Sequence, residues 1–491
     1  MLLLGIDLGT SSVKVSVVDA NTQKRVASAQ YPETEAEIIS LQPGWAEQSP
    51  DNWWQYTQQA ILKAHQTKKY NPKDIAAIGI AYQMHGLVCV DKNQNVLRNS
   101  IIWCDSRAVS YGEKAFRAMG EEQTLAYLLN SPGNFTASKL AWVKENEPDL
   151  YQRIDKIMLP GDFIAMKLTG EITTTIPALS EGIFWDFKND TVSKSILATF
   201  GFERSVIPVI KEVFTSHGTL KKEIADELLL KQAIPVTYKA GDQPNNALSL
   251  NVLQPGELAA TAGTSGVVYG VTDQVNYDPL SRVNSFAHVN YSSQLKRIGV
   301  LLCINGTGIL NSWLRKNVFN GLSYEQMNAE AAKVDIGSDG LLFYPFGNGA
   351  ERVLENKDLG AAMKGLYFNR HHRGHMARAA QEGIVFALNY GMDIMKQMGM
   401  KLITVRAGYA NMFLSEVFAS SFANTTGCVV ELYNTDGSIG AARAAGVGAK
   451  IYNSFAEGFK EMKVIKKVEP QPEWQEQYGE FYGKWKEGIS L

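Results

Sequence analysis

The sequence predicts an α/β protein of two related halves that share one phosphate-binding cleft. In residues 2–15, an apolar run ends on Asp7 and is followed by a turn at Gly9-Thr10-Ser11. After the turn, apolar residues recur at every second position, which predicts a returning strand. Residues 259–270 repeat this plan around Gly263-Thr264-Ser265, about half a chain later. Either hairpin alone could be an ordinary polar turn. The repetition favours two halves that each present a hairpin to phosphate.

The residues of the first turn suit a nucleotide. Gly9 lets the backbone approach a ligand closely. The N–H groups and hydroxyls of Thr10 and Ser11 can donate to phosphate oxygens, and we group Lys14 with them. Asp7 stands at the end of the buried strand, where it can hold a cation beside these donors.

Bulk properties narrow the class of protein. A length of 491 residues predicts two or three domains. A net charge of -2 and scattered Lys and Arg argue against nucleic acid as a partner. We expect no membrane span and no signal peptide, because no apolar run is long enough and the N-terminus enters a strand at once. The four cysteines lie far apart, which predicts reduced, mostly buried thiols and a cytoplasmic protein.

The elements of the first half can be taken in order. After the opening hairpin, Ser49-Pro50 predicts an N-cap followed by proline at the first helical position. Helices over 133–147 and 157–170 read as an insertion. The strands are expected over residues 25–31, 75–81, 87–91 and 234–242.

A cluster typical of polyol recognition follows the strands of the first half. Met84 and His85 come directly after the strand over 75–81. Trp103 can lie against the carbon face of a sugar, and Asp105 and Arg107 can bond its hydroxyls. The alternatives are a core histidine and a local ion pair. We favour binding for His85, beside a strand end and a glycine, and leave Arg107 open.

The second half is expected to repeat the order of elements. A strand over 297–304 precedes a helix from Gly308, and a long helix runs from His375 to Met395. Strands over 402–405 and 429–432 follow, with Asn411 as a candidate cap between them. Residues 436–442 open a helix of small residues, which could approach another helix or a flat adenine.

These features together predict phosphoryl transfer, in which a protein mainly positions groups and stabilises charge. Asp7 would hold Mg²⁺ through water, because Mg²⁺ keeps much of its hydration. Asp242 would take the proton from the attacking hydroxyl. The cleft would close on the sugar and exclude water. Other nucleotide motifs, including the P-loop and the protein-kinase set, are absent from the sequence.

At this point the chain resembles the FGGY family of carbohydrate kinases, part of the actin-like ATPase superfamily with its ribonuclease H-like fold. The resemblance covers nearly the whole chain. The motifs that carry it are Gly5-Ile6-Asp7-Leu8-Gly9-Thr10-Ser11, Gln83-Met84-His85-Gly86, Trp103-x-Asp105-x-Arg107, Gly241-Asp242, Gly263-Thr264-Ser265-Gly266 and Glu382-Gly383.

The resemblance implies an ATP-dependent kinase with Mg²⁺ that phosphorylates D-xylulose at its terminal hydroxyl. It implies a sugar-binding domain over 1–240 and an ATP-binding domain over 241–491, whose last helices could pack back on the first. Met84 and His85 would contact the ketopentose, and Gly408 and Asn411 would lie by the adenosine. A homodimer is compatible with it. The alternatives are another sugar or polyol (ribulose, gluconate, a deoxyketose) and a non-catalytic assembly or sugar-sensing protein.

Three positions depart from the family pattern. Gln243-Pro244 replaces Asn-Ala after the base, so Gln243 brings a longer amide to the sugar. Tyr409 follows Gly408 where glycine is usual, so it could stack on the nucleotide. Gly161-Asp162-Phe163 replaces Lys-Asp-Tyr, so no lysine function carries over there.

Overall fold

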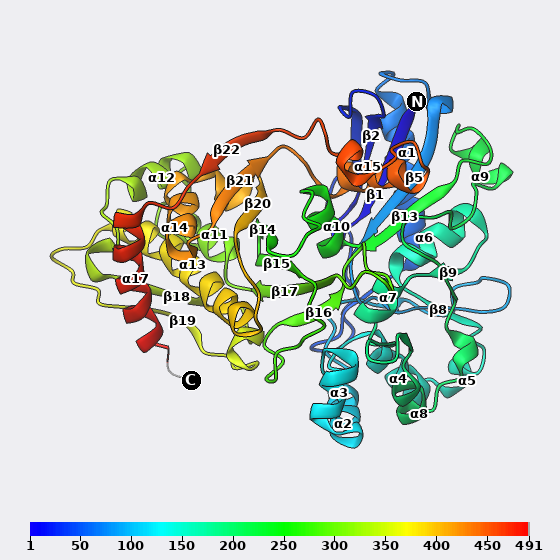
Figure 1. Cartoon of the computed structure of the whole chain (residues 1–491), viewed down its shortest axis with the longest axis horizontal. Coiled ribbons are helices and arrows are strands. Elements are labelled where there is room, and N and C mark those ends of the chain that lie inside the picture. Colours follow the sequence, from blue (N-terminus) through cyan, green and yellow to red (C-terminus); the bar gives the residue numbers. More distant parts are fainter. Residues whose placement is uncertain (490–491) are drawn as a thin grey trace.

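The computed structural model describes residues 1–489 as two α/β lobes side by side (Figure 1). The first lobe is built on a five-stranded sheet of order β13-β5-β1-β2-β3. β1 pairs antiparallel with β2 and parallel with β5, and β13 is parallel to β5. The strands are β1 (Leu2–Leu8), β2 (Val13–Asp19), β3 (Arg25–Tyr31), β5 (Ile75–Tyr82) and β13 (Val236–Gly241). The predicted opening hairpin is confirmed.

The second lobe repeats this order within a seven-stranded sheet, β16-β17-β15-β14-β20-β21-β22. β14 is antiparallel to β15 and parallel to β20, as β1 is to β2 and β5. The predicted internal repeat is therefore confirmed. The strands are β14 (Glu257–Ala262), β15 (Gly266–Thr272), β16 (Asn284–Ala287), β17 (Ile298–Ile304), β20 (Thr404–Gly408), β21 (Val429–Tyr433) and β22 (Val464–Val468).

Helices and short strands complete the first lobe. Ser49 caps the first helix by accepting a hydrogen bond from the Asn52 N–H, as predicted. The helices are α1 (Pro50–Gln66), α2 (Val109–Met119), α3 (Glu121–Leu128), α4 (Thr136–Asn146), α5 (Pro148–Tyr151), α6 (Pro160–Thr169), α7 (Ile176–Glu181), α8 (Lys194–Phe200) and α9 (Lys222–Glu227). The short strands are β4 (Glu47–Gln48), β6 (Val88–Val90), β7 (Ser100–Ile101), β8 (Lys156–Met158), β9 (Thr173–Thr174), β10 (Trp185–Asp186), β11 (Thr191–Val192) and β12 (Val209–Ile210).

The prediction of a helix over 157–170 is wrong at its start. Residues 156–158 form β8, which pairs with β6, and α6 begins only at Pro160. The reason is local, because a residue before proline avoids helical backbone. Leu159 is extended, with φ -80° and ψ 163°.

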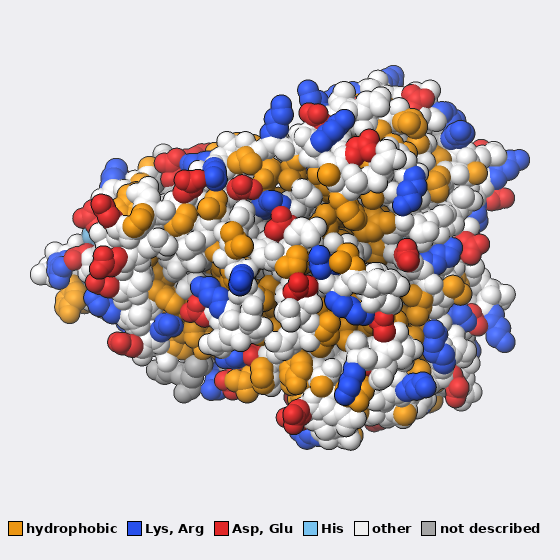
Figure 2. All heavy atoms as spheres, in the orientation of Figure 1, with side chains coloured by type: hydrophobic (Ala, Val, Ile, Leu, Met, Phe, Trp, Pro, Cys, Tyr) orange, Lys and Arg blue, Asp and Glu red, His pale blue; other side chains and the backbone are white. Residues whose placement is uncertain are grey.

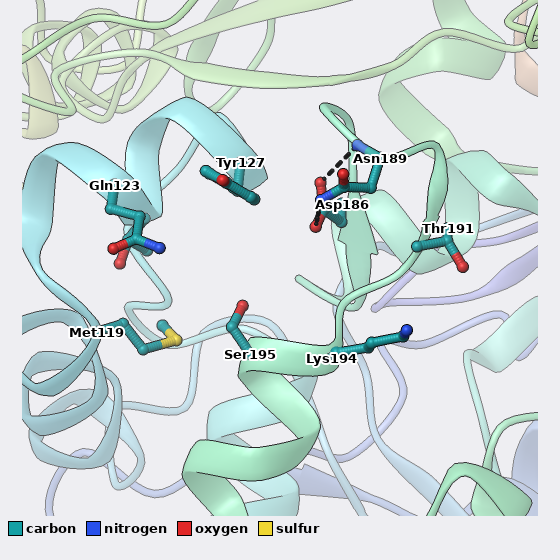
Figure 3. A pocket seen from close by; sticks show the side chains of 9 residues that line it. Met119, Gln123, Tyr127, Asp186, Asn189, Thr191, Lys194 and Ser195 are labelled. Atoms are coloured by element: carbon teal, nitrogen blue, oxygen red, sulfur yellow. Dashed lines mark hydrogen bonds between the residues drawn. The ribbon is translucent and has the colours of Figure 1, made fainter.

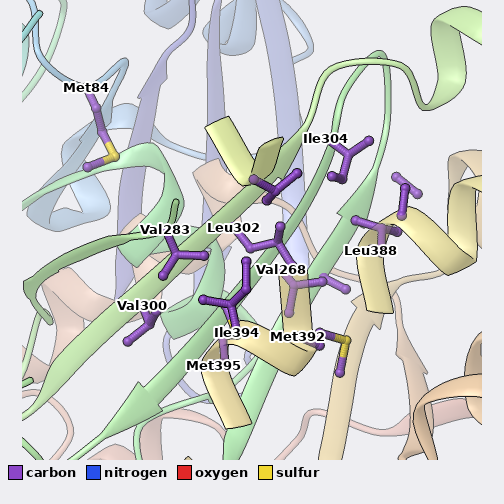
Figure 4. Packing of buried hydrophobic residues seen from close by; sticks show 14 of the residues in the cluster. Met84, Val268, Val283, Val300, Leu302, Ile304, Leu388, Met392, Ile394 and Met395 are labelled. Atoms are coloured by element: carbon purple, nitrogen blue, oxygen red, sulfur yellow. The ribbon is translucent and has the colours of Figure 1, made fainter. Parts of the chain in front are cut away.

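The second lobe packs its sheet against long helices. Leu302 and Ile304 of β17 and Val268 of β15 meet Leu388 and Met392 of α13 in a continuous apolar core (Figure 4). The helices of this half of the chain are α10 (Asp242–Ser249), α11 (Gly308–Asn317), α12 (Tyr324–Ala332), α13 (Arg373–Gln397), α14 (Glu416–Thr426), α15 (Gly437–Gly448), α16 (Phe455–Gly458) and α17 (Pro472–Glu487); β18 (Leu342–Phe346) and β19 (Gly360–Lys364) form a hairpin.

Helix α15 is the small-residue helix predicted from residues 436–442, and it lies against the first sheet (Figure 1). It also approaches another helix, as predicted, because a Cβ added at Gly440 would sit 2.3 Å from the Ser249 Cβ of α10. A Cβ added at Gly5 would sit 1.8 Å from the Ser438 carbonyl oxygen, and one at Gly79 would sit 2.1 Å from that of Ala441. Glycines on β1 and β5 and small residues on α15 thus let backbone approach backbone.

The charges on the surface and the burial of the cysteines can be compared with the predictions. Acidic and basic side chains are interspersed over the visible face, without a one-signed patch (Figure 2). A search of residues 1–489 for helices with the length and apolar content of a membrane span finds none. All four cysteines are free; Cys89 and Cys428 are buried, Cys303 is half-buried and Cys104 is exposed. The prediction of mostly buried thiols therefore fails at Cys104.

Candidate active site

Parallel strands bring the two predicted catalytic carboxylates to one edge of the first sheet. Asp7 lies opposite Ala81 of β5, and Gly241 lies opposite Tyr82, so Asp7 and Asp242 flank the end of the same strand. The carboxyl ends of parallel strands are where α/β proteins hold ligands. The residues that follow β5, Met84 and His85, open onto the same edge.

Both carboxyl groups have raised pKa values. Burial, with the charge of Asp7 second, raises the pKa of Asp242 to about 7. Burial and the charge of Asp436 raise the pKa of Asp7 to about 6, although Lys14 opposes them. Asp242 can therefore exchange a proton near neutral pH, which a general base requires.

Both lobes line a cavity of about 420 Å³ that holds six of the predicted residues. Its size suits a small polyol. The lining from the first lobe and the start of α10 is Met84, His85, Trp103, Asp242 and Gln243; the second lobe adds Ser265, Val267, Asn284, Leu301, Cys303, Asn305, Ala350, Glu351, Arg352 and Asn356. We call this cavity the acceptor pocket.

His85 is held as a neutral hydrogen-bonding group. Burial and the nearby Lys139 lower the pKa of His85 to about 3. Its Nδ1 lies 3.0 Å from the Glu181 carbonyl oxygen, which can only accept, so Nδ1 carries the proton and Nε2 is left as an acceptor. Lys139 Nζ and Thr136 Oγ1 donate to the His85 carbonyl at 2.9 and 3.2 Å. These contacts hold a residue whose φ is +65°.

Trp103 joins the acceptor pocket to the first hairpin. The residue is 52% exposed, and its Nε1 donates to Thr10 Oγ1 at 2.9 Å. Ser11 at the tip is also exposed. Lys14 forms an ion pair of 2.7 Å with Asp436, the N-cap of α15, so this predicted nucleotide residue already has a partner in the chain.

Asp105 and Arg107 do not line the acceptor pocket. Asp105 is fully buried and accepts from the Ala46 N–H at 2.6 Å, while Arg107 Nη2 donates to it at 2.7 Å. Arg107 also binds Glu47 at 2.6 Å and stacks on Trp45 at 3.8 Å. This arrangement favours the alternative of a local ion pair over sugar binding, because the chain itself occupies these donors and acceptors.

A second cavity of about 700 Å³ lies on the other side of the second hairpin tip. Gly263 and Thr264 line it, whereas the next residue, Ser265, lines the acceptor pocket. Tyr409, predicted to face a nucleotide, lines it too, together with Asn411. The remaining lining residues are Ala262, Gly308, Ile309, Asn311, Ser312, Tyr324, Glu325, Asn328, Met412, Leu414 and Ser415. We call this cavity the donor pocket.

One prediction about the loop after β20 needs correction, that of the helix cap. Gly408 ends β20 and is absent from the lining of the donor pocket, so its predicted place by the adenosine stays a prediction. Asn411 does not cap the next helix, because it sits in a 3₁₀ turn over Asn411–Leu414 with φ +53°. Ser415 caps α14 instead, accepting from the Phe418 N–H.

A third pocket, of about 530 Å³, lies away from these residues on the first lobe (Figure 3). Asp186 is its only carboxylate among the described lining residues. That carboxylate accepts from the Lys188 N–H, the Asn189 N–H and Asn189 Nδ2 at 2.8–3.0 Å, closing a turn between β10 and β11. The group is satisfied within the chain, so we do not assign chemistry to this pocket.

Sequence reasoning missed the wall that the second lobe contributes to the acceptor pocket. Asn284, Glu351 and Arg352 have no neighbours in sequence among the predicted residues, so no motif pointed to them. Glu181 was also missed. It is 2% exposed, neither carboxylate oxygen has a hydrogen-bond partner within residues 1–489, and one oxygen lies over Gly241, beside Met84.

Comparison with known proteins gives the family. The domain described as "FGGY family of carbohydrate kinases, N-terminal domain" matches residues 2–249, and the corresponding C-terminal domain matches residues 258–449. This chain belongs to the FGGY family of carbohydrate kinases, which phosphorylate sugars with ATP.

Named relatives cover almost the whole chain. Xylulose kinase of Escherichia coli is 31% identical over 467 residues, which cover 93% of this chain and 92% of the relative. A crystal structure of a "xyloylose kinase" from Brucella ovis matches with a TM-score of 0.88 and 26% identity, covering 99% of this chain and 98% of that one. Glycerol kinase of Plasmodium falciparum with ADP has a TM-score of 0.88 at 23% identity, covering 100% and 99% of the two chains; this likeness concerns the fold alone.

Proposed function

We propose that this chain is a xylulokinase, which transfers the γ-phosphoryl group of ATP to D-xylulose and forms D-xylulose 5-phosphate. The observation that carries the proposal is that Asp7, His85 and Asp242 lie at the same edge of the first sheet. The donor pocket and the acceptor pocket lie on either side of the tip of the second hairpin. Relatives named xylulose kinase, at 28–31% identity over most of the chain, support the choice of sugar.

In this proposal Asp242 is the general base. The terminal hydroxyl of the sugar loses its proton to Asp242 as its oxygen bonds to the γ-phosphorus. The bond from that phosphorus to the bridging oxygen breaks, and the electron pair leaves with ADP. A carboxylate whose pKa is about 7 can accept the proton of the hydroxyl during transfer and can release it to solvent afterwards at neutral pH.

The sugar is oriented by side chains of the acceptor pocket. We assign Nε2 of His85 as an acceptor for one sugar hydroxyl, Gln243 Oε1 as an acceptor for another, and Met84 and Trp103 as apolar contacts. Gln243 Oε1 is buried without a hydrogen-bond partner in the described chain, which supports a ligand at this amide.

The nucleotide would occupy the donor pocket. The Thr264 and Ser265 N–H and hydroxyl groups face the phosphates in this proposal, with Thr10 and Ser11 across the cleft. We assign Tyr409, a residue that is 45% exposed, to the side of the adenine base, where its ring would stack. The roles of Gly408 and Asn411 by the adenosine stay predictions.

A magnesium ion fits the carboxylate edge. Residues 1–489 contain no group of three or more His, Cys, Asp or Glu side chains that could hold a metal ion, and Mg²⁺ in proteins usually keeps several waters. Asp7 and Asp242 both have raised pKa values, and the charge of Asp7 contributes to that of Asp242, so a cation beside Asp7 would relieve this repulsion. Asp7 would hold the ion through water, and bound Mg²⁺ supplies charge neutralisation for the phosphates.

Three further assignments remain proposals. We divide the chain at 240/241 into a sugar-binding and an ATP-binding domain. We assign the protein to the cytoplasm, which free cysteines support. We also propose that a homodimer is compatible with the fold.

The decisive test is a sugar panel with coupled ADP detection, run with D-xylulose, ribulose, gluconate, a deoxyketose and no sugar. We expect D-xylulose to give the highest kcat/KM. A higher kcat/KM with another sugar would refute D-xylulose as the substrate but would leave the assignment as a sugar kinase intact. ADP release that is independent of every sugar, together with ATP-driven sedimentation, would support an assembly protein instead.

Asp242→Asn tests the base. We expect kcat to fall by ~10²–10⁴-fold with sugar binding retained, the usual contribution of general-base catalysis. Asp186→Asn is the matched control, because its carboxylate closes a turn away from the acceptor pocket. An Asp242→Asn enzyme within tenfold of wild type would exclude this role.

A further inference from the structure

Arg352 is a cation in the acceptor pocket that the sequence motifs did not reveal. It begins a 3₁₀ turn, Arg352–Leu354, on the second lobe. It lines the same cavity as Asp242 and Ser265, and it is the only Lys or Arg among the described lining residues. Its charge also acts on His85, across from it on the first lobe.

The guanidinium of Arg352 has no ion pair among residues 1–489. Its single hydrogen bond to residues 1–489 runs from Nη1 to the Ser281 carbonyl oxygen at 3.3 Å, and no carboxylate of these residues pairs with it. Burial lowers the pKa of Arg352, as expected for a cation taken from water. The side chain is half-buried, and a partly desolvated charge without a partner gains from a ligand that supplies one.

The neighbouring carboxylate does not serve as that partner. Both oxygens of Glu351 accept from the Asn305 N–H, at 2.9 and 3.1 Å. Burial raises the pKa of Glu351 to about 7, so part of it is neutral at pH 7. The remaining N–H groups of the Arg352 fork therefore stay available to an anion in the pocket.

We propose that Arg352 binds the oxygens of the phosphoryl group during transfer and of the phosphate ester in the product. This rests on the proposed kinase function. ATP and sugar bring one anionic group to the acceptor pocket, the phosphoryl group; xylulose itself is neutral. As the sugar oxygen bonds to phosphorus and the bridging oxygen departs with ADP, charge spreads over the equatorial oxygens. A planar guanidinium meets two such oxygens at once.

The test compares Arg352→Gln, Arg352→Lys and the control Arg370→Gln, whose side chain is 53% exposed and paired with Asp339. Steady-state kinetics give kcat and the KM for sugar. Titration calorimetry gives Kd for D-xylulose and for D-xylulose 5-phosphate. Thermal unfolding reports whether each variant is folded.

We expect Arg352→Gln to lower kcat by at least ~10²-fold, the loss typical of removing one preorganised donor from developing charge. The Kd for D-xylulose 5-phosphate should rise by roughly tenfold or more, which corresponds to the lower end of the free energy that hydrogen bonds to a charged group contribute. Sugar binding should stay within about threefold by the same reasoning, because its uncharged hydroxyls have other partners. Arg352→Lys should retain part of both effects, since lysine keeps the charge and loses the fork.

Several outcomes would overturn the assignment. Equal weakening of sugar and product would make Arg352 a sugar contact. Loss of gluconate turnover alone would make it a carboxylate site. If Arg352→Gln does not fold, an Arg352→Lys enzyme with the wild-type ratio of product to sugar affinity would overturn it. Failure of the proposed function would be seen in the wild-type enzyme. If wild type prefers another sugar, the same comparison of variants is made with that sugar and its phosphate ester. If wild type phosphorylates no sugar, both proposals are overturned.

Discussion

The contact between β1 and α15 provides a sharp test of how this fold is held together. In Gly5→Ala the new Cβ would sit 1.8 Å from the Ser438 carbonyl oxygen and 2.6 Å from the Ala442 nitrogen. Ordinary contact begins at 3.4 Å, so strand and helix would have to separate by about 1.6 Å, the difference between 3.4 and 1.8 Å. Both atoms are backbone, so no side chain can swing away.

The magnitude follows from overpacking, which costs typically 1–3 kcal/mol. We expect the upper end, about 3 kcal/mol, because two rigid elements must part. At roughly 2–4 °C per kcal/mol for a domain of this size, Tm should fall by about 6–12 °C in a calorimetric scan. Turnover should fall as well, because Gly437 at the start of α15 packs on the Asp7 carboxylate.

Gly479→Ala is the matched control. Gly479 lies in α17, and a Cβ there would meet nothing within 4 Å. Alanine is favoured over glycine inside a helix by about 0.5–1 kcal/mol, so Tm should stay level or rise. If Gly5→Ala lost no more stability than this control, close backbone approach would not be what joins α15 to the first sheet.

Two further predictions concern the site and its support. Because Asp242 acts ionised and its pKa is raised to about 7, kcat/KM should fall tenfold per pH unit below about pH 7 and level off above it; a pH–rate profile that stays flat down to pH 5 would contradict the proposed base. Asp105→Asn should lower the free energy of unfolding by about 3–5 kcal/mol, because it leaves Arg107 buried with only part of its counter-charge. The KM for sugar should change little, since neither residue lines the acceptor pocket; a tenfold rise in KM at unchanged stability would restore the sugar-binding interpretation.

Much of the architecture was predictable because it is encoded locally. A run of apolar residues that ends on Asp7 and turns at Gly9 defines a strand and a hairpin within fifteen residues. Its copy around Thr264 predicted the internal repeat, which the matching strand orders confirm. Residues at strand ends, such as Met84 and Asp242, could be assigned to one edge, because parallel strands end at the same side of a sheet.

The sequence alone thus determined the two halves, their hairpins and the carboxyl-edge residues, since each depends on neighbours within one strand or turn. Tertiary structure decided which polar side chains face the cleft. Arg107 turned inward to pair with Asp105 and Glu47, while Arg352, distant in the chain, lines the acceptor pocket from the second lobe. Whether a charged side chain is paired depends on partners that other elements bring beside it in the fold. The residue type at one position does not reveal those partners.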